Sequence, residues 1–181
     1  MEKSFIIAGF GGQGVMVAGQ LLSYTACETT DKYVTYFPSY GAEMRGGTAN
    51  CSVCVSDSPI ASPVITKASC VIAMNRPSLD KFESFVRPGG TLIVNSSLID
   101  VKAKRDDINV YYVPANELAE QLGNMKVANV VILGACLELT KCVSVDTVLD
   151  AIALKLGKRK AHLVDINKHA LIAGAEAVKA K

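Results

Sequence analysis

A glycine-rich segment near the N-terminus is the first place where this sequence could do chemistry. Residues 9–14 read Gly-Phe-Gly-Gly-Gln-Gly. They follow a short apolar stretch and precede a helix-like one, which is the context that a G-x-G-x-x-G motif requires. Glycines there let the chain turn tightly and bring backbone N–H groups to a phosphate at the helix N-terminus. The candidate phosphate-binding residues are Gly11, Gly12, Gln13 and Gly14. A tight turn without a ligand is the alternative.

The residues that follow this segment separate two kinds of phosphate site. A P-loop needs Gly-Lys-Ser/Thr, but Val15 and Met16 follow Gly14 here. A dinucleotide site needs an acidic residue about 20 positions further on, at the end of the second strand. The nearest such residue is Glu43, beyond the proline that closes that strand. The sequence therefore disfavours NAD binding, and a stand-alone nucleotide-binding protein of Rossmann type is the alternative function.

A second segment, residues 37–50, is rich in glycine and mixed in charge, so we expect an irregular loop beside the glycine turn. Arginine can bind phosphate or carboxylate through two parallel hydrogen bonds. Consecutive glycines allow close approach or an amide-lined anion site. The candidates in this loop are Arg45, Gly46, Gly47 and Thr48. The alternative is a surface loop with a local pair between Glu43 and Arg45.

Catalytic and metal-binding patterns do not emerge from the remaining residues. The two histidines, His162 and His169, have no nucleophile or metal-ligand partner at a recognisable spacing. Cys51 and Cys54 lie in a strand-like stretch, where residues three apart point to opposite faces. We predict no catalytic residue, no metal site, and reduced, mostly buried thiols at all six cysteines. The other four are scattered among apolar neighbours: Cys27, Cys70, Cys136 and Cys142.

The elements that must position these residues alternate between strand-like and helix-like. Strands are predicted at 4–8, 33–37, 49–55, 70–73, 91–94 and 110–113, with Pro38 closing the second. Helices are predicted at 14–27, 116–121, 127–139, from a Ser144 cap to Gly157, and at 164–178. This alternation predicts an α/β fold of three layers, with a mainly parallel sheet and helices on both faces. We expect it to be Rossmann-like and to form a single domain over residues 1–181.

Three local patterns refine this prediction. Asn75 and Asn95 each follow an apolar strand, so they should lie at the carboxyl edge of the sheet, where open α/β folds place ligands. Residues 127–139 are apolar nearly all round, which is typical of a buried helix. The small residues of the last helix would permit close approach of a neighbour.

Composition and charge limit the classes of partner. The chain has 181 residues, of which 50% are hydrophobic and 20% charged, and a net charge of +2. Such a charge gives no strong attraction to nucleic acid or to membrane surfaces. No apolar run approaches the roughly 20 residues of a membrane span, and the N-terminus does not resemble a signal peptide. We therefore expect a cytoplasmic protein that binds neither nucleic acid nor membrane.

The two glycine-rich segments together resemble the gamma subunit of 2-oxoacid:ferredoxin oxidoreductases. The resemblance is carried by residues 11–15 and 38–47, then by 74–82 and by 129–135, so it runs over most of the chain. It is strongest to the 2-oxoglutarate branch, with the pyruvate and branched-chain oxoacid branches close behind.

The resemblance implies a subunit that is inactive alone. Members of that family convert a 2-oxoacid and coenzyme A to acyl-CoA, CO₂ and reduced ferredoxin. Thiamine diphosphate and iron–sulfur clusters are then expected in partner alpha, beta and delta subunits, with ferredoxin reached only indirectly. Coenzyme A is the one ligand that the resemblance implies for this chain, with its phosphates near residues 11–14 and 45–48. The alternatives are a purely structural subunit whose loops dock against the alpha subunit, and contacts between two copies of the chain.

Overall fold

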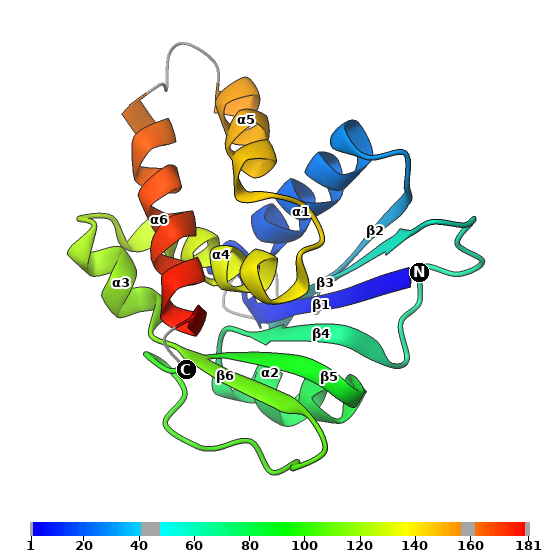
Figure 1. Cartoon of the computed structure of the whole chain (residues 1–181). Helices are drawn as coiled ribbons and strands as arrows, with labels where there is room; N and C mark the ends of the chain where they lie inside the picture. Colours follow the sequence, from blue (N-terminus) through cyan, green and yellow to red (C-terminus); the bar gives the residue numbers. More distant parts are fainter. Residues whose placement is uncertain (1, 41–47, 157–161, 180–181) are drawn as a thin grey trace.

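The computed structural model describes residues 2–40, 48–156 and 162–179, which form one α/β unit around a six-stranded sheet (Figure 1). The strands are β1 (Glu2–Phe10), β2 (Tyr33–Tyr40), β3 (Thr48–Ser56), β4 (Ala68–Ala73), β5 (Val86–Asn95) and β6 (Asn109–Val113). The helices are α1 (Val15–Thr29), α2 (Arg76–Phe82), α3 (Ala115–Gln121), α4 (Ala128–Thr140), α5 (Val145–Leu156) and α6 (His162–Lys179). Two 3-10 turns, η1 (Glu83–Phe85) and η2 (Met125–Val127), complete these elements.

The sheet has the strand order β2-β3-β1-β4-β5-β6. β1, β4, β5 and β6 pair in parallel, whereas β3 runs antiparallel to both of its neighbours, β1 and β2. β2 therefore points the same way as β1, and β3 alone is reversed among the described strands. The prediction of a mainly parallel sheet is confirmed.

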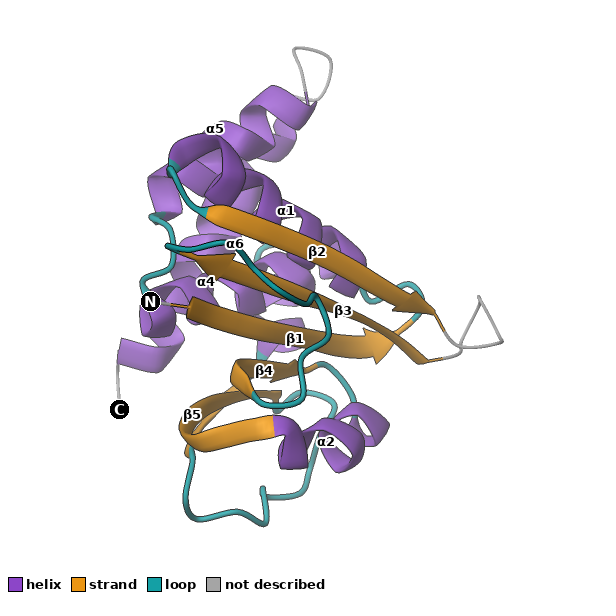
Figure 2. Cartoon of the chain, turned by 90° about the vertical axis from the view of Figure 1, so that its right-hand side faces the viewer, coloured by secondary structure: helices purple, strands orange, loops and turns teal. Residues whose placement is uncertain are grey.

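Both faces of the sheet are covered by helices, as predicted. Along β1, Phe5 and Ile7 belong to one hydrophobic cluster and Ile6 and Ala8 to the other, because successive side chains of a strand point to opposite faces. The first cluster packs under α1, α4 and α6, and the second under α2. Figure 2 shows α2 set apart from the group formed by α1, α4, α5 and α6.

Two predicted boundaries were wrong around the second glycine-rich segment. β2 does not end before Pro38 but continues to Tyr40, and β3 already begins at Thr48. The irregular loop expected over 37–50 is thus much shorter at both ends. The reason is that β2 is an edge strand, where a proline without an N–H group is tolerated.

The C-terminal helices form a tightly packed layer. Every residue of α4 from Ala128 to Leu137 is buried, which confirms the predicted buried helix. Ser144 caps α5 as predicted, because its Oγ accepts a hydrogen bond from the Thr147 N–H at 3.1 Å. The predicted end at Gly157 lies outside the described residues. No helix in the described ranges is both long and apolar enough to cross a membrane.

Candidate functional site

The first glycine-rich segment forms the turn between β1 and α1, at the carboxyl edge of the sheet. Gly12 and Gly14 adopt positive φ angles of 98° and 74°, which side chains other than glycine rarely adopt. Gly14 is the N-cap of α1, and the first helical hydrogen bond runs from the Ala18 N–H to the Gly14 carbonyl at 3.0 Å. The N–H groups before it have no acceptor within the helix, and the first turn contains no acidic residue. The turn therefore offers backbone donors and a favourable dipole to an anion.

The side chain of Gln13 points into the protein and holds this turn in place. Its Oε1 accepts hydrogen bonds from the Phe10 N–H at 2.6 Å and from Asn75 Nδ2 at 3.1 Å. Its Nε2 donates to the Met74 carbonyl at 3.3 Å. The amide thus ties the end of β1 to the residues that follow β4. A contact of Gln13 with a ligand stays a prediction, and the geometry gives its side chain a positioning role.

A second amide supports the turn from the helical side. Asn129, near the start of α4, donates from Nδ2 to the Gly14 carbonyl at 3.1 Å, although the two residues are 115 positions apart. A Cβ atom on Gly14 would stand 2.5 Å from the same Nδ2 atom, so only glycine fits there. Asn129 is 6% exposed, and its Oδ1 has no hydrogen-bond partner among the described residues. The sequence placed Asn129 only in a buried helix, and an isolated polar residue in an apolar run was the available signal.

The second glycine-rich segment is brought to the same edge by strand register. Phe10 at the end of β1 pairs with Thr48 at the start of β3, and Ala49 pairs with Tyr40 at the end of β2. Thr48 is exposed beside the glycine turn. The candidates Arg45, Gly46 and Gly47 lie outside the described residues, so their contacts stay predictions. The structure does show that both flanks of their segment lie at the edge where the turn lies.

The two asparagines predicted at this edge do lie there, but their side chains serve the fold. Asn75 caps α2, accepting from the Ser78 N–H at 2.9 Å. Asn95 is fully buried, donates to Asn116 Oδ1 at 2.8 Å, and accepts from the Ala115 N–H at 3.3 Å. These bonds join the end of β4 to α2, and the end of β5 to the start of α3, the helix after β6. They make the carboxyl edge rigid, which favours a preformed binding surface.

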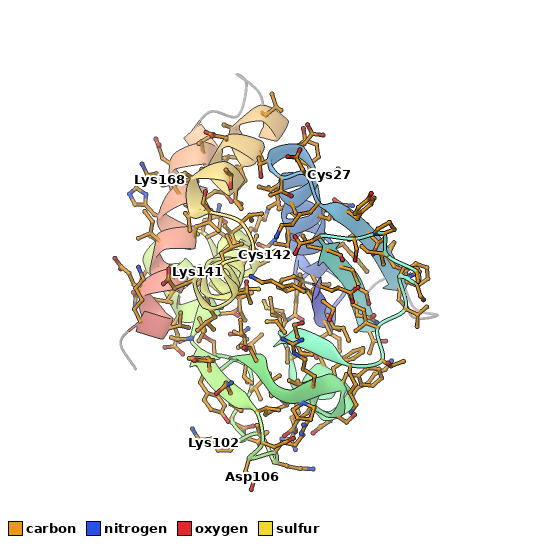
Figure 3. All side chains as sticks on the ribbon, turned by 45° about the vertical axis from the view of Figure 1, so that its right-hand side comes forward. Cys27, Lys102, Asp106, Lys141, Cys142 and Lys168 are labelled. Carbon is orange, nitrogen blue, oxygen red and sulfur yellow. The ribbon has the colours of Figure 1, made fainter. Side chains whose placement is uncertain are left out.

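The thiols are distributed as the sequence predicted. Cys51 and Cys54 are both buried, and only Cys51 belongs to the cluster beneath α1. Burial raises the pKa of the Cys51 thiol to about 12 and that of Cys142 to about 11. Cys70 and Cys136 lie 3.9 Å apart, sulfur to sulfur, in the core. Figure 3 places Cys142 in the middle of the molecule and Cys27, the exposed thiol, on α1.

Metal ligands and catalytic groups do not gather in the described part of the chain. His169 is exposed on α6. No three histidine, cysteine, aspartate or glutamate side chains of the described residues are placed to hold a metal ion. What the site offers is a turn rich in backbone donors, supported by two internal amides. The fold and site together define a Rossmann-like α/β domain with a glycine turn at its carboxyl edge, at the N-terminus of α1.

Comparison with known proteins identifies the family of this domain. The model for "Pyruvate ferredoxin/flavodoxin oxidoreductase" matches residues 4–177, and the chain belongs to that family. The ketoisovalerate oxidoreductase subunit VorA of Methanothermobacter marburgensis is 37% identical over 94% of this chain but only 35% of its own length. The chain thus spans about a third of that relative. The 2-oxoglutarate synthase subunit KorC of Methanocaldococcus jannaschii is 34% identical, over 84% of this chain and 82% of its own.

A solved structure agrees with the sequence comparison. The gamma subunit of a keto/oxoacid ferredoxin oxidoreductase from Geobacter sulfurreducens superposes with a TM-score of 0.87 and 27% identity. The superposition covers 99% of this chain and 98% of the other. The resemblance to gamma subunits that the sequence suggested is confirmed, and so is the α/β fold.

Proposed function

We propose that this chain, over residues 1–181, is the gamma subunit of a thiamine diphosphate-dependent 2-oxoacid:ferredoxin oxidoreductase. The complex would convert a 2-oxoacid and coenzyme A to acyl-CoA and CO₂ while it reduces ferredoxin. This chain is inactive alone, completes the complex and helps to bind coenzyme A. The observation that carries the proposal is the register of β1 with β3, which sets Thr48 beside the donor-rich turn at residues 11–14. Family membership supplies the reaction class.

The proposed substrate is 2-oxoglutarate. Among the relatives, the KorC subunits of 2-oxoglutarate synthases match over most of their own length, 82% to 85%, as well as most of this chain. The VorA relatives match over 35% of theirs. The test is to assay the purified complex with 2-oxoglutarate, pyruvate and ketoisovalerate. A higher kcat/KM for either of the other two acids would overturn this choice.

The proposed partners are the alpha, beta and delta subunits, which would hold thiamine diphosphate and the iron–sulfur clusters. The relatives VorA and KorC are themselves named as subunits of oxidoreductases, which supports partners of this kind. The test is an anaerobic pull-down of the tagged chain from its native cells, followed by mass spectrometry. Stoichiometric recovery of thiamine-binding and iron–sulfur subunits is expected. Recovery of the chain alone would favour a stand-alone nucleotide-binding protein.

The proposed role of the site is to hold the phosphates of coenzyme A. The amides at the start of α1 supply donors and a favourable dipole, and Arg45 would add a positive charge. We expect Arg45→Ala to raise the KM for coenzyme A roughly tenfold in the assembled complex, the usual size of one charged hydrogen bond. The matched control is Lys168→Ala, an exposed charge on α6 far along the chain from both segments. An unchanged KM in an intact complex would remove Arg45 from the site.

Subunit docking is a second candidate role for this chain, along the edge strand β2. β2 is an edge strand, and it exposes Tyr33 and Phe37 by 51% and 49%. Large exposed apolar residues on an edge strand favour contact with another chain. A Phe37→Ser variant would separate docking from ligand binding. If β2 docks a subunit, less of the complex should assemble, and the assembled fraction should still bind coenzyme A.

A further inference from the structure

β2 is the longer of the two edge strands in the described sheet, with eight residues against five in β6. Its residues, 33–40, include no lysine, arginine, aspartate or glutamate. Natural edge strands usually carry such charges, because a bare edge pairs readily with another chain. Pro38 is the residue of β2 that protects an edge in this sense. The outermost strand in Figure 2 is therefore built to be covered by a partner.

The side chains of β2 divide between the two faces of the sheet. Val34 and Tyr36 pack against the cluster beneath α1. Tyr33 and Phe37 alternate with them, so they lie on the opposite face, where they are 51% and 49% exposed. Two large aromatic side chains thus stand four residues apart beside the open edge.

Pro38 indicates which backbone groups of β2 face outward. A proline in an edge strand turns the side that lacks the N–H group to the open edge. The backbone of Val34 faces the same way, because these groups alternate in direction along a strand. Thr35 faces β3 instead, where it pairs with Cys54. A strand that pairs with this edge can centre on Thr35, so that the missing donor of Pro38 lies outside the central pairs.

We propose that the partner on this edge is a second copy of β2, paired antiparallel about a two-fold axis at Thr35. The proposal rests on the docking role proposed above for β2 and names its occupant. In this register Thr35 faces Thr35 of the copy, and Tyr33 faces Phe37 of the copy on both sides of the axis. Each exposed ring then covers a ring of the other chain. Cross-strand aromatic pairs of this kind stabilise antiparallel sheets.

The surface beside the edge also fits a second copy. A groove of about 380 Å³ lies between α1 and β2, lined by residues that include Tyr24, Cys27 and Val34. Tyr24 is 40% exposed. A two-fold axis normal to the sheet brings both α1 helices to the same side of the seam, so each copy closes the groove of the other. The two six-stranded sheets become one.

The first test is disulfide trapping at the axis. Residues that face each other between the hydrogen-bonded pairs have Cα atoms about 4.5 Å apart, within the range that a disulfide spans. Thr35→Cys should therefore form a covalent dimer with a mild oxidant. The background carries Cys27→Ser and Cys54→Ala, which remove the exposed thiol and the neighbour of residue 35 in β3. Ser39→Cys, exposed on the same strand, faces Asp31 of the copy and should be trapped roughly tenfold more slowly.

The second test is sedimentation of the full chain, which should show twice the mass of one chain. Phe37→Asp should reduce this to the mass of one chain, because the seam would bury two unpaired carboxylates. The matched control is Leu98→Asp, also at a side chain that is 49% exposed, in the turn after β5 toward the other edge of the sheet. It should leave the dimer intact. Circular dichroism checks that both variants fold.

The outcomes separate this inference from the docking role on which it rests. A full chain that sediments as a monomer, or equal trapping of Thr35→Cys and Ser39→Cys, would overturn the second copy. Loss of assembly in Phe37→Ser would then still support another subunit on β2, so the docking role would stand. A dimer that survives Phe37→Asp would overturn the seam at β2.

Discussion

Gly174 on α6 lies directly against the backbone of Val131 on α4: a Cβ atom on Gly174 would stand 1.7 Å from the Val131 carbonyl oxygen. The contact is reciprocal, since a Cβ on Gly134 of α4 would stand 2.1 Å from the Leu171 carbonyl oxygen of α6. The two helices therefore touch backbone to backbone at two places. This close approach sets the position of α4, which carries Asn129 to the glycine turn.

We expect Gly174→Ala to destabilise the protein. In an exposed helix the same change would stabilise by about 1 kcal/mol, because alanine is the better helix former. Here the added methyl group must push α6 away from α4, and overpacking of this kind typically costs about 1–3 kcal/mol. The urea midpoint followed by circular dichroism should fall. The control is Glu176→Ala, at an exposed position of the same helix, which should leave the urea midpoint unchanged or slightly raised. A variant as stable as the parent would show that the helices can separate without cost.

We expect Gln13→Glu to loosen the glycine turn. The carboxylate keeps an acceptor for the Phe10 N–H. It loses the donor to the Met74 carbonyl, because a carboxylate oxygen replaces Nε2 and then faces that carbonyl oxygen. Loss of such a bond costs roughly 1–3 kcal/mol. Thermal unfolding should shift down, and the KM for coenzyme A in the complex should rise. Gln20→Glu, exposed on α1, makes the same chemical change without an internal partner. Equal effects of the two substitutions would contradict a positioning role for Gln13.

Much of the fold could be predicted because its signals are local. Apolar runs marked six strands, glycines at residues 11, 12 and 14 marked the turn, and Asn75 was placed correctly after β4. Pro38 misled the prediction because a proline ends most strands but not an edge strand. Whether β2 lies at an edge depends on the strand order, which the local pattern does not contain.

The site was predictable only in part, for a related reason. The turn could be found from its glycines, whereas its two supports depend on tertiary contacts. Asn129 reaches Gly14 across 115 residues, and Gln13 turns inward because Met74 and Asn75 happen to lie beneath it. The bonding capacity of an amide does not reveal whether it faces a ligand or the interior. The contacts of Arg45 stay predictions, since that residue lies outside the described ranges.

We expect Glu83→Leu to free the segment between β5 and β6. Glu83 is 8% exposed, and its Oε1 accepts hydrogen bonds from the N–H groups of Lys104 at 2.5 Å and Arg105 at 2.8 Å. Leucine would leave both donors without this acceptor, at a cost of roughly 1–3 kcal/mol. Hydrogen exchange at these two amides should accelerate, while exchange in β1 should change less. Asp106→Leu, in the same segment but exposed, should leave the Lys104 and Arg105 amides protected (Figure 3). Unchanged protection in Glu83→Leu would mean that the segment is held by other contacts.

The buried thiols should make the protein less stable in alkaline solution. Burial raises the pKa of Cys51 from 9.0 to about 12 and that of Cys142 from 9.0 to about 11. Below pH 9 both thiols are protonated in the folded and the unfolded chain, so they add no pH dependence. Above pH 9 the unfolded chain releases protons that the folded chain retains, and the free energy of unfolding falls until the folded pKa is passed.

For Cys51 alone the loss should reach about 2 kcal/mol near pH 10.5, at 1.36 kcal/mol for each pH unit above 9. The measurement is urea unfolding from pH 7 to pH 10.5 under reducing, anaerobic conditions. Cys51→Ser removes the titration but keeps a donor near the Val15 carbonyl, which the thiol approaches at 3.4 Å. This variant should be less stable at pH 7 but should lose less stability as the pH rises. The two proteins differ only at residue 51, so the difference in slope reports the Cys51 thiol. Parallel curves would show that the Cys51 thiol ionises in the folded protein as readily as in the unfolded chain.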